Sequence, residues 1–325
     1  MLKSFKIAPL TIVKDILSHK LYNCDLCYNN CNVNRNIVNG LCNSGLEVIV
    51  SSYCIHYGEE PVLVGSDELK TKNGVGNIFF GNCNLKCVFC QNYQISQNHL
   101  SEANFVVSKE SLANIILEFQ GKNVNSIGFV SPTHFIPQII EAIELASKKG
   151  LNLPLIYNTN CYDSPEIIEY LNGIFDIYLP DFKYSDDKFA KKYSNAKGYF
   201  ELAKKNIIKM YEQVGSELII EDNILKRGLI IRHLILPNNI AGSYEILKFI
   251  SGLDKNISIS LMSQYYPAYK AKNFDLISRN ISESEYNRVL DWMDGLGLEN
   301  GFVQDFDSKD YYIPDFENRN QPFKR

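Results

Sequence analysis

The chain has 325 residues, of which 45% are hydrophobic and 22% are charged, so it can bury a large core as a soluble globular protein. Its net charge is −4 and its isoelectric point is about 5.8, which argues against nucleic acid as a partner. No apolar run approaches the roughly 18 residues that span a bilayer, and the N-terminal segment has no cleavage-site pattern. We therefore expect a cytoplasmic protein with no membrane partner.

Residues 1–76 are rich in Asn and Cys and show weak hydrophobic periodicity, which predicts a loop-rich extension that depends on metal for folding. From residue 77 onward, apolar runs alternate with segments of helical spacing. Strands are expected at 77–81, 126–130, 153–159, 176–182, 228–236, 257–264 and 301–306. Helices are expected at 108–120, 137–148, from 164 onward, at 186–214 with a break near 195–198, at 243–252 and at 282–296.

This alternation predicts right-handed βαβ units and a parallel sheet. We expect an α/β fold, a partial parallel (β/α)6 TIM-type barrel over residues 77–307, with the cysteine-rich extension 1–76 before it and a polar tail 308–325 after it. In barrels of this kind, chemistry lies at the carboxyl ends of the strands. Candidate polar segments follow four of the predicted strands, at 83–90, 131–134, 158–159 and 181–183.

Seven of the nine cysteines fall in two tight clusters, which indicates metal binding rather than disulfides in a chain without a secretion signal. Cys83, Cys87 and Cys90 have the spacing C-x-x-x-C-x-x-C directly after a predicted strand. Three thiolates on one loop suit three irons of a [4Fe–4S] cluster and leave the fourth iron open to a small molecule. A zinc site or ordinary buried cysteines are the alternatives. Cys54 and Cys161 stand alone.

The other cluster contains four cysteines, which are enough ligands to close a metal site against substrate. Its members are Cys24, Cys27, Cys31 and Cys42. Zinc and an auxiliary [4Fe–4S] cluster both fit this set, and unligated thiols are a third reading. The intervening segment 32–40, NVNRNIVNG, is typical of a small metal knuckle and favours zinc or a structural iron site.

The three-cysteine spacing, in this loop setting, resembles the signature of the radical SAM superfamily. Over residues 20–306 the chain is similar to the pyruvate formate-lyase activating enzyme-like branch, in stretches such as IFFGNCNLKCVFCQNYQIS, FVSPTHFIPQI and DIYLPDFKYSD. The resemblance implies that a [4Fe–4S] cluster on Cys83, Cys87 and Cys90 cleaves S-adenosylmethionine (SAM) reductively to a 5′-deoxyadenosyl radical, which abstracts a hydrogen atom.

The resemblance also implies which side chains bind SAM. Residues 131–134 replace a Gly-Gly-Glu motif of relatives, residues 158–159 match an Asp-Thr pair and residues 181–183 match Asp-Leu-Lys. The implied contacts are Phe89, Ser131, Thr133, His134, Asn158, Thr159, Asp181, Lys183 and Arg232. Core packing for Phe89, a structural role for His134 and a strand-end salt bridge for Asp181 and Lys183 are the alternatives. Cys161 either exchanges a hydrogen atom with the radical or fills space.

The favoured function is activation of a glycyl radical enzyme, with reduced flavodoxin or ferredoxin as the electron donor. Modification of another peptide or of a small molecule is the alternative within the same chemistry. A non-catalytic metal-binding interaction protein is the alternative from another class. Glu59 and Glu60, which precede Pro61, are expected to form an exposed acidic turn, and a part in the mouth of the substrate site is the alternative.

Overall fold

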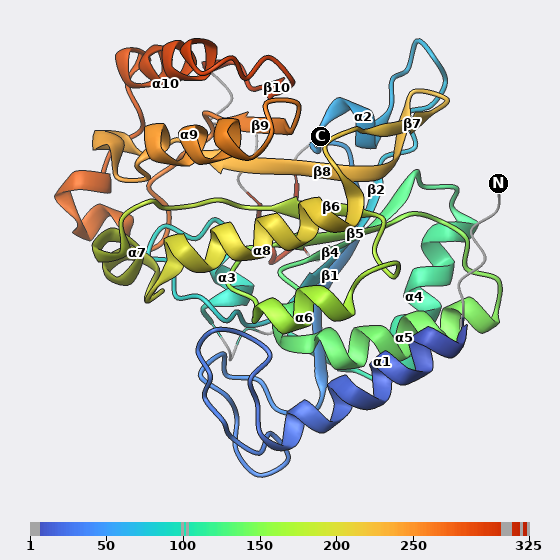
Figure 1. The fold of residues 1–325 in the computed structure, drawn as a ribbon. Coiled ribbons are helices and arrows are strands. Elements are labelled where there is room, and N and C mark those ends of the chain that lie inside the picture. The colour runs from blue at the N-terminus through green and yellow to red at the C-terminus, as the bar shows by residue number, and fades with distance from the viewer. Residues whose placement is uncertain (1–6, 99–100, 102–103, 307–313, 319–320, 324–325) are drawn as a thin grey trace.

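The computed structural model describes residues 7–98, 101, 104–306, 314–318 and 321–323, so residues 308–313, 319–320 and 324–325 of the expected tail lie outside the described residues. A single mixed sheet runs through the molecule in the order β10-β9-β8-β6-β5-β4-β2-β1-β3 (Figure 1). Seven of its strands are parallel neighbours, namely β2 (Val75–Phe80), β4 (Ser126–Val130), β5 (Leu155–Thr159), β6 (Ile177–Pro180), β8 (Ile224–Leu234), β9 (Ser258–Met262) and β10 (Gly301–Val303).

Three further strands are antiparallel to their neighbours. β1 (Val48–His56) pairs with β2, β3 (Phe105–Val107) pairs with β1, and β7 (Ile219–Glu221) pairs with β8. In the described part of the chain β10 and β3 end the sheet without pairing with each other, so the sheet is not closed. The predicted α/β fold with a partial TIM-type barrel is therefore confirmed.

Helices follow most parallel strands, as the periodicity predicts. They are α4 (Lys109–Gly121), α5 (Ile136–Lys148), α6 (Pro165–Tyr170), α7 (Asp187–Ser194), α8 (Tyr199–Val214), α9 (Ser243–Leu253) and α10 (Glu283–Gly295). The predicted break falls at Asn195, which has a φ of 53° and ends α7 in a left-handed cap. Ser282 and Glu285 form the predicted capping box of α10, in which each side chain bonds the other residue's backbone N–H.

The core lies on both faces of the parallel strands. All six residues of β2 and all four of β6 are buried, which explains why these strands read as continuous apolar runs rather than alternating ones. On α5, Ile139, Ile140 and Ile143 are fully buried, so this helix packs its apolar face inward as the sequence predicts. The result is a sheet with an apolar interior and with polar segments after several of its strands, at the carboxyl edge.

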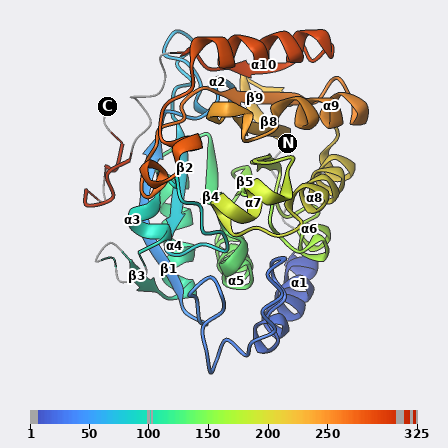
Figure 2. The same ribbon diagram turned by 90° about the vertical axis from the view of Figure 1, so that its left-hand side faces the viewer.

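The N-terminal extension contains more regular structure than its composition predicts. The helix α1 (Ile7–His19) lies along α5, at the opposite side of the molecule from α9 and α10 (Figures 1 and 2). The strand β1 belongs to the main sheet, and the intervening segment 23–47 carries four of the cysteines. The division into regions 1–76, 77–307 and 308–325 stays a prediction.

No helix in the described ranges combines the length and the hydropathy that crossing a membrane requires.

Candidate active site

Three cysteine side chains gather on the loop that follows β2. Gly81 begins this loop, and a Cβ on it would lie 2.5 Å from Ile49 Cγ2, so the close approach of β1 requires glycine there. Cys83 and Cys87 are each 8% exposed and Cys90 is half-buried, and all three are free thiols. The fold thus holds the three predicted ligands in a largely enclosed position at the carboxyl edge of the sheet.

Polar groups from several elements are directed at these sulfur atoms. The contacts are Leu85 N–H to Cys83 Sγ (3.4 Å), Asn160 Nδ2 to Cys83 Sγ (3.5 Å), Ser194 Oγ to Cys87 Sγ (3.0 Å), and Ser96 Oγ paired with Cys90 Sγ (3.1 Å). Hydrogen bonds to cysteine sulfur are among the features that set the reduction potential of an iron–sulfur cluster. These partners therefore fit thiolates that ligate a metal cluster.

Burial dominates the electrostatics of the loop. It raises the pKa of Cys83 to about 11 and that of Cys90 to about 12, so without metal these groups are protonated thiols at pH 7. Burial also opposes the charge of Lys183, but Asp181, whose Oδ2 lies 2.7 Å from Lys183 Nζ, outweighs it and raises the lysine's pKa. Burial raises the pKa of Cys87 as well, and the positive charge of Lys183 acts against that rise.

The chemistry of this donor set fits an iron–sulfur cluster. Within the residues that the structure describes, no three or more His, Cys, Asp or Glu side chains are arranged to hold one metal ion. The cysteines of a cluster bind separate irons, so they need not converge on a single point. Cys83, Cys87 and Cys90 supply three soft ligands, and the next two residues of the loop, Gln91 and Asn92, line a cavity.

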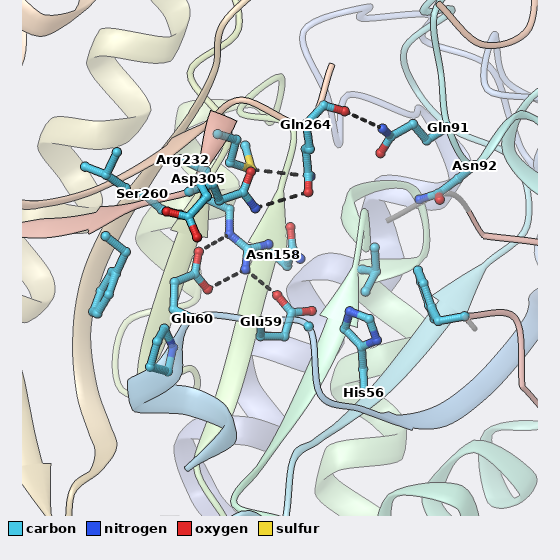
Figure 3. A pocket seen from close by; sticks show the side chains of 18 of the residues that line it. His56, Glu59, Glu60, Gln91, Asn92, Asn158, Arg232, Ser260, Gln264 and Asp305 are labelled. Carbon is cyan, nitrogen blue, oxygen red and sulfur yellow. Dashed lines mark hydrogen bonds and ion pairs between the residues drawn. The ribbon is translucent and has the colours of Figure 1, made fainter. Parts of the chain in front are cut away.

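That cavity has a volume of about 480 Å³ and lies where the carboxyl ends of the parallel strands meet (Figure 3). Asn158 of β5, Arg232 of β8 and Ser260 of β9 contribute to its wall. Glu59 and Glu60 enter from the segment that joins β1 to α2 (Pro61–Val64). A cleft at this edge is the position in which open α/β sheets and barrels place ligands.

Arg232 is the centre of a buried ion cluster in the wall of the cavity (Figure 3). Its Nε and Nη2 donate to the two carboxylate oxygens of Glu60 at 2.9 and 2.6 Å, and Nη2 also contacts Glu59 Oε2. Asn77 Nδ2 donates to the other oxygen of Glu59 at 2.6 Å. The expected exposed acidic turn is therefore wrong, because Glu60 is only 6% exposed. Pairing with Arg232 is the physical reason, since an unpaired buried guanidinium is costly.

The segment 131–134 is tied to the framework of the fold. Ser131 has a φ of 52°, and its backbone N–H donates to the carbonyl oxygen of Asn158 at 2.8 Å. His134 is 2% exposed, and its Nε2 bonds the carbonyl oxygen of Gly81 at 2.9 Å, directly before the cysteine loop. Burial lowers the pKa of His134 to about 3, so the ring is neutral at pH 7 and Nε2 carries the donated proton. His134 thus braces the start of the cysteine loop.

A fully buried carboxylate, Asp163, connects two other predicted residues. It accepts hydrogen bonds from Thr133 Oγ1 (2.7 Å), Tyr157 Oη (2.7 Å) and Thr159 Oγ1 (2.5 Å). Burial raises the pKa of Asp163, and the three hydroxyl donors act against that rise. Thr133 and Thr159 are therefore held together with Asp163 below the cavity rather than in its lining.

The remaining predicted residues lie at different places. Phe89 is buried and makes edge-to-face contacts with Tyr184 and Tyr265, at centroid distances of 6.5 and 5.8 Å. Cys161 has a φ of 64°, and its thiol is fully buried, with Sγ 3.7 Å from the carbonyl oxygen of Ala203. Asn158 and Arg232 are the predicted SAM contacts that line the cavity, whereas Phe89 and Cys161 do not.

The sequence reasoning missed His56 and Asp163, and for Glu59 and Glu60 it favoured an exposed turn over a place in the site. Glu59, Glu60 and His56 line the cavity, although only the sequence signal of paired acids before a proline marks their segment. Asp163 belongs to no recognisable motif. Its role depends on hydroxyl groups of Thr133, which is 30 residues away, and of Tyr157 on β5. Only the three-dimensional arrangement reveals these roles.

This α/β partial barrel gathers three cysteines, two of them buried and one half-buried, beside a cavity at its carboxyl edge. That arrangement is typical of a metal-dependent enzyme. The family model described as the radical SAM superfamily matches residues 77–225. The chain is also 33% identical, over 297 residues, to the uncharacterized protein MJ0674 of Methanocaldococcus jannaschii, covering 89% of this chain and 80% of that protein. The chain belongs to the radical SAM superfamily.

Membership of this superfamily implies an enzyme that carries out radical chemistry with a [4Fe–4S] cluster, SAM and an electron donor. The matched range begins in β2 and includes Cys83, Cys87 and Cys90. The archaeal relative is uncharacterized, so neither comparison assigns a substrate.

Proposed function

We propose that Cys83, Cys87 and Cys90 ligate a [4Fe–4S] cluster, and that SAM is cleaved reductively in the adjoining cavity. The supporting observation is that the three thiols, two buried and one half-buried, are followed on the same loop by Gln91 and Asn92, which line that cavity. When bound, the cluster supplies the electron that splits SAM into methionine and a 5′-deoxyadenosyl radical, which takes a hydrogen atom from the substrate. Reduced flavodoxin or ferredoxin is the proposed electron donor.

The charges in the cavity wall support SAM as its ligand. Two carboxylates, Glu59 and Glu60, face the single guanidinium of Arg232, and Asp305 also lines the cavity. This excess of negative charge favours a cationic ligand, and SAM carries a sulfonium and an ammonium group. In this arrangement Arg232 fixes the two acids, and the acids present their charge to the ligand.

Side-chain amides in the same cavity support a peptide as the second substrate. The amides belong to Gln91, Asn92, Asn158, Gln264 and Gln304. Gln304 Nε2 donates to Gln264 Oε1 at 3.1 Å, while the buried Oε1 of Gln304 has no hydrogen-bond partner among the residues that the structure describes. An amide offers both donors and an acceptor, which match the N–H and C=O groups of an extended peptide. We propose a glycine-containing backbone segment of a glycyl radical enzyme as the hydrogen donor.

The test is an anaerobic incubation of the reconstituted chain with SAM, dithionite and a purified glycyl radical enzyme from the same organism. We expect 5′-deoxyadenosine together with a glycyl-radical doublet in the electron paramagnetic resonance (EPR) spectrum of the partner. Nucleoside without that doublet indicates another peptide or a small molecule as the substrate. If no nucleoside forms although iron and sulfide analysis shows an intact cluster, the proposed function is wrong.

We also infer that Cys24, Cys27, Cys31 and Cys42 hold a second metal. Three of these thiols are buried and Cys31 is half-buried, and they lie in one segment that links α1 to β1. Four thiolates satisfy all positions of a metal site, so this site has no place for substrate. Zinc and an iron–sulfur cluster are the two candidates.

A further inference from the structure

The four N-terminal cysteines converge although the segment that carries them has little regular structure. The backbone N–H of Cys24 donates to Val33 O and its carbonyl accepts from Asn32 N–H, both at 2.9 Å, which folds the segment back on itself. This fold places Cys31 Sγ 3.7 Å from the carbonyl oxygen of Cys24. The segment therefore turns back on itself and brings Cys31 next to Cys24.

Gly40 lies next to the sulfur atoms of Cys31 and Cys42. A Cβ on Gly40 would lie 3.4 Å from Cys31 Sγ and 3.4 Å from Cys42 Sγ. Burial raises the pKa of Cys27 to about 12, and the neighbouring Cys42 and Cys24 add to that rise. Gly40 therefore leaves room for Cys31 and Cys42, and Cys24 and Cys42 lie near enough to Cys27 to act on its charge.

A buried cation next to these thiols points to an anionic ligand. Arg35 is 2% exposed and donates to three carbonyl oxygens, of Ser44 (3.1 Å), His134 (2.6 Å) and Gly45 (2.5 Å). Among the described residues no carboxylate forms an ion pair with it, and burying an uncompensated charge is costly. Four thiolates around a divalent metal or a [4Fe–4S]²⁺ core carry a net charge of about −2. That charge would compensate Arg35. Burial raises the pKa of Cys24, and the positive charge of Arg35 acts against that rise.

Zinc and an iron–sulfur cluster both accept four thiolates, and they differ in what they can do. Zinc undergoes no redox change, so a zinc site serves structure alone. An iron–sulfur cluster carries electrons. A direct connection between the N-terminal cysteines and the catalytic set therefore favours the cluster.

A chain of hydrogen bonds joins the two sets of cysteines. Asn29 Nδ2 lies 3.6 Å from Cys27 Sγ and 2.7 Å from the carbonyl oxygen of Asn84. Asn160 Nδ2 lies 2.7 Å from Asn84 Oδ1 and 3.5 Å from Cys83 Sγ. Cys27 and Cys83 are therefore connected through three asparagine residues, without an intervening solvent-filled gap along these contacts.

We propose that the four N-terminal cysteines ligate a second iron–sulfur cluster, which passes electrons to the catalytic cluster through this asparagine bridge. This inference rests on the proposed function, because the electron acceptor is the catalytic cluster on Cys83, Cys87 and Cys90. In each transfer, one electron leaves the N-terminal cluster, which is oxidised by one unit, and reduces the catalytic cluster by one unit. The electron is replaced by a low-potential flavin or iron–sulfur carrier protein. Full ligation by four thiolates keeps SAM away from the N-terminal cluster.

The first test uses the full-length chain with Cys83, Cys87 and Cys90 all replaced by Ala, reconstituted anaerobically with iron and sulfide. We expect about four irons per chain and an EPR signal after reduction with dithionite. The same variant with Cys54→Ala added is the matched control, since Cys54 lies in β1 outside both clusters, and it should retain this iron. One zinc and no iron per chain, or no bound metal in a variant with native circular dichroism, overturns the proposal.

A reciprocal variant covers the case in which the triple variant does not fold. Replacing Cys24 and Cys31 by Ser should lower the iron content from about eight to about four per chain and leave the EPR signal of the catalytic cluster. Iron that stays at the wild-type value overturns the second cluster. If the wild-type chain holds both clusters but forms no 5′-deoxyadenosine, the proposed function is contradicted and the N-terminal cluster is not.

The bridge is tested by Asn29→Leu, which removes both of its contacts without touching a cysteine. Freeze-quench EPR after mixing with reduced ferredoxin should show at least fivefold slower reduction of the catalytic cluster, at unchanged iron content. Asn36→Leu, on an exposed turn of the same segment, is the matched control. Equal rates for Asn29→Leu and wild type contradict the relay.

Discussion

Replacement of Arg232 by Met tests the buried ion cluster that shapes the cavity. The change removes the partner of Glu59 and Glu60 and leaves two carboxylates in a buried position. Breaking a buried ion pair by removing one member typically costs about 3–5 kcal/mol, because the remaining charge is left uncompensated. We therefore expect the free energy of unfolding to fall by about that amount at pH 7, measured by urea titration of the reconstituted chain.

The triple variant Arg232→Met with Glu59→Gln and Glu60→Gln separates charge from packing. It contains the same Met but no buried carboxylate, so it should regain most of the lost stability. If the single and triple variants lose equal stability, the loss comes from packing and the electrostatic reasoning is refuted.

The pH dependence of the same variants gives a second readout. In the wild type, burial alone would raise the pKa of Glu59, but Arg232 outweighs it and lowers that pKa to about 2. This contribution to stability is complete above pH 4.5, the ordinary value for the group, and is lost as the pH falls toward 2. In Arg232→Met burial prevails, so the deficit should shrink in acid, where the carboxylates are protonated. A deficit that is independent of pH contradicts this account.

Three further predictions concern the groups around the cysteine loop. Ser194→Ala removes the O–H bond to Cys87 Sγ, worth about 1 kcal/mol in favour of the reduced cluster, and should lower its reduction potential by about 40 mV in an EPR-monitored redox titration. His134, with its pKa near 3, should show ring chemical shifts that do not titrate between pH 5 and 8, and its stabilising contribution should fall as the pH drops below 6.5. Thr133→Val removes a donor to buried Asp163 and should lower the free energy of unfolding by about 1–3 kcal/mol in a urea titration, whereas an unchanged value contradicts the proposed support.

The sequence predicts the parallel part of the fold well, because strands buried on both faces and amphipathic helices leave distinct patterns. The strand at 126–130 coincides with β4, and the helix at 282–296 exceeds α10 by one residue at each end. The extension before residue 77 was harder to interpret. β1 carries Ser51, Ser52 and Cys54 among its apolar residues, so it lacks a clear alternation, and its place beside β2 depends on contacts distant in sequence.

The candidate site was predictable only where one loop carries the whole signal. The spacing of Cys83, Cys87 and Cys90 is local, whereas the partners of Arg232 lie 172 and 173 residues away and no local rule connects them. For His134 the sequence left a structural role and a SAM contact open, and its bond to Gly81 O now supports the structural one. Such roles depend on contacts between residues that are far apart in the chain, and the spacing of residues in a single sequence does not reveal those contacts.

Quantified SAM cleavage by matched cysteine variants tests the central claim most directly. The reconstituted wild type and Cys54→Ala should each produce 5′-deoxyadenosine when supplied with SAM and dithionite, and Cys87→Ala should produce at most a thousandth as much. Equal product from wild type and Cys87→Ala, or none from a wild type with a verified cluster, would contradict the assignment of the three-cysteine loop as the centre of the chemistry.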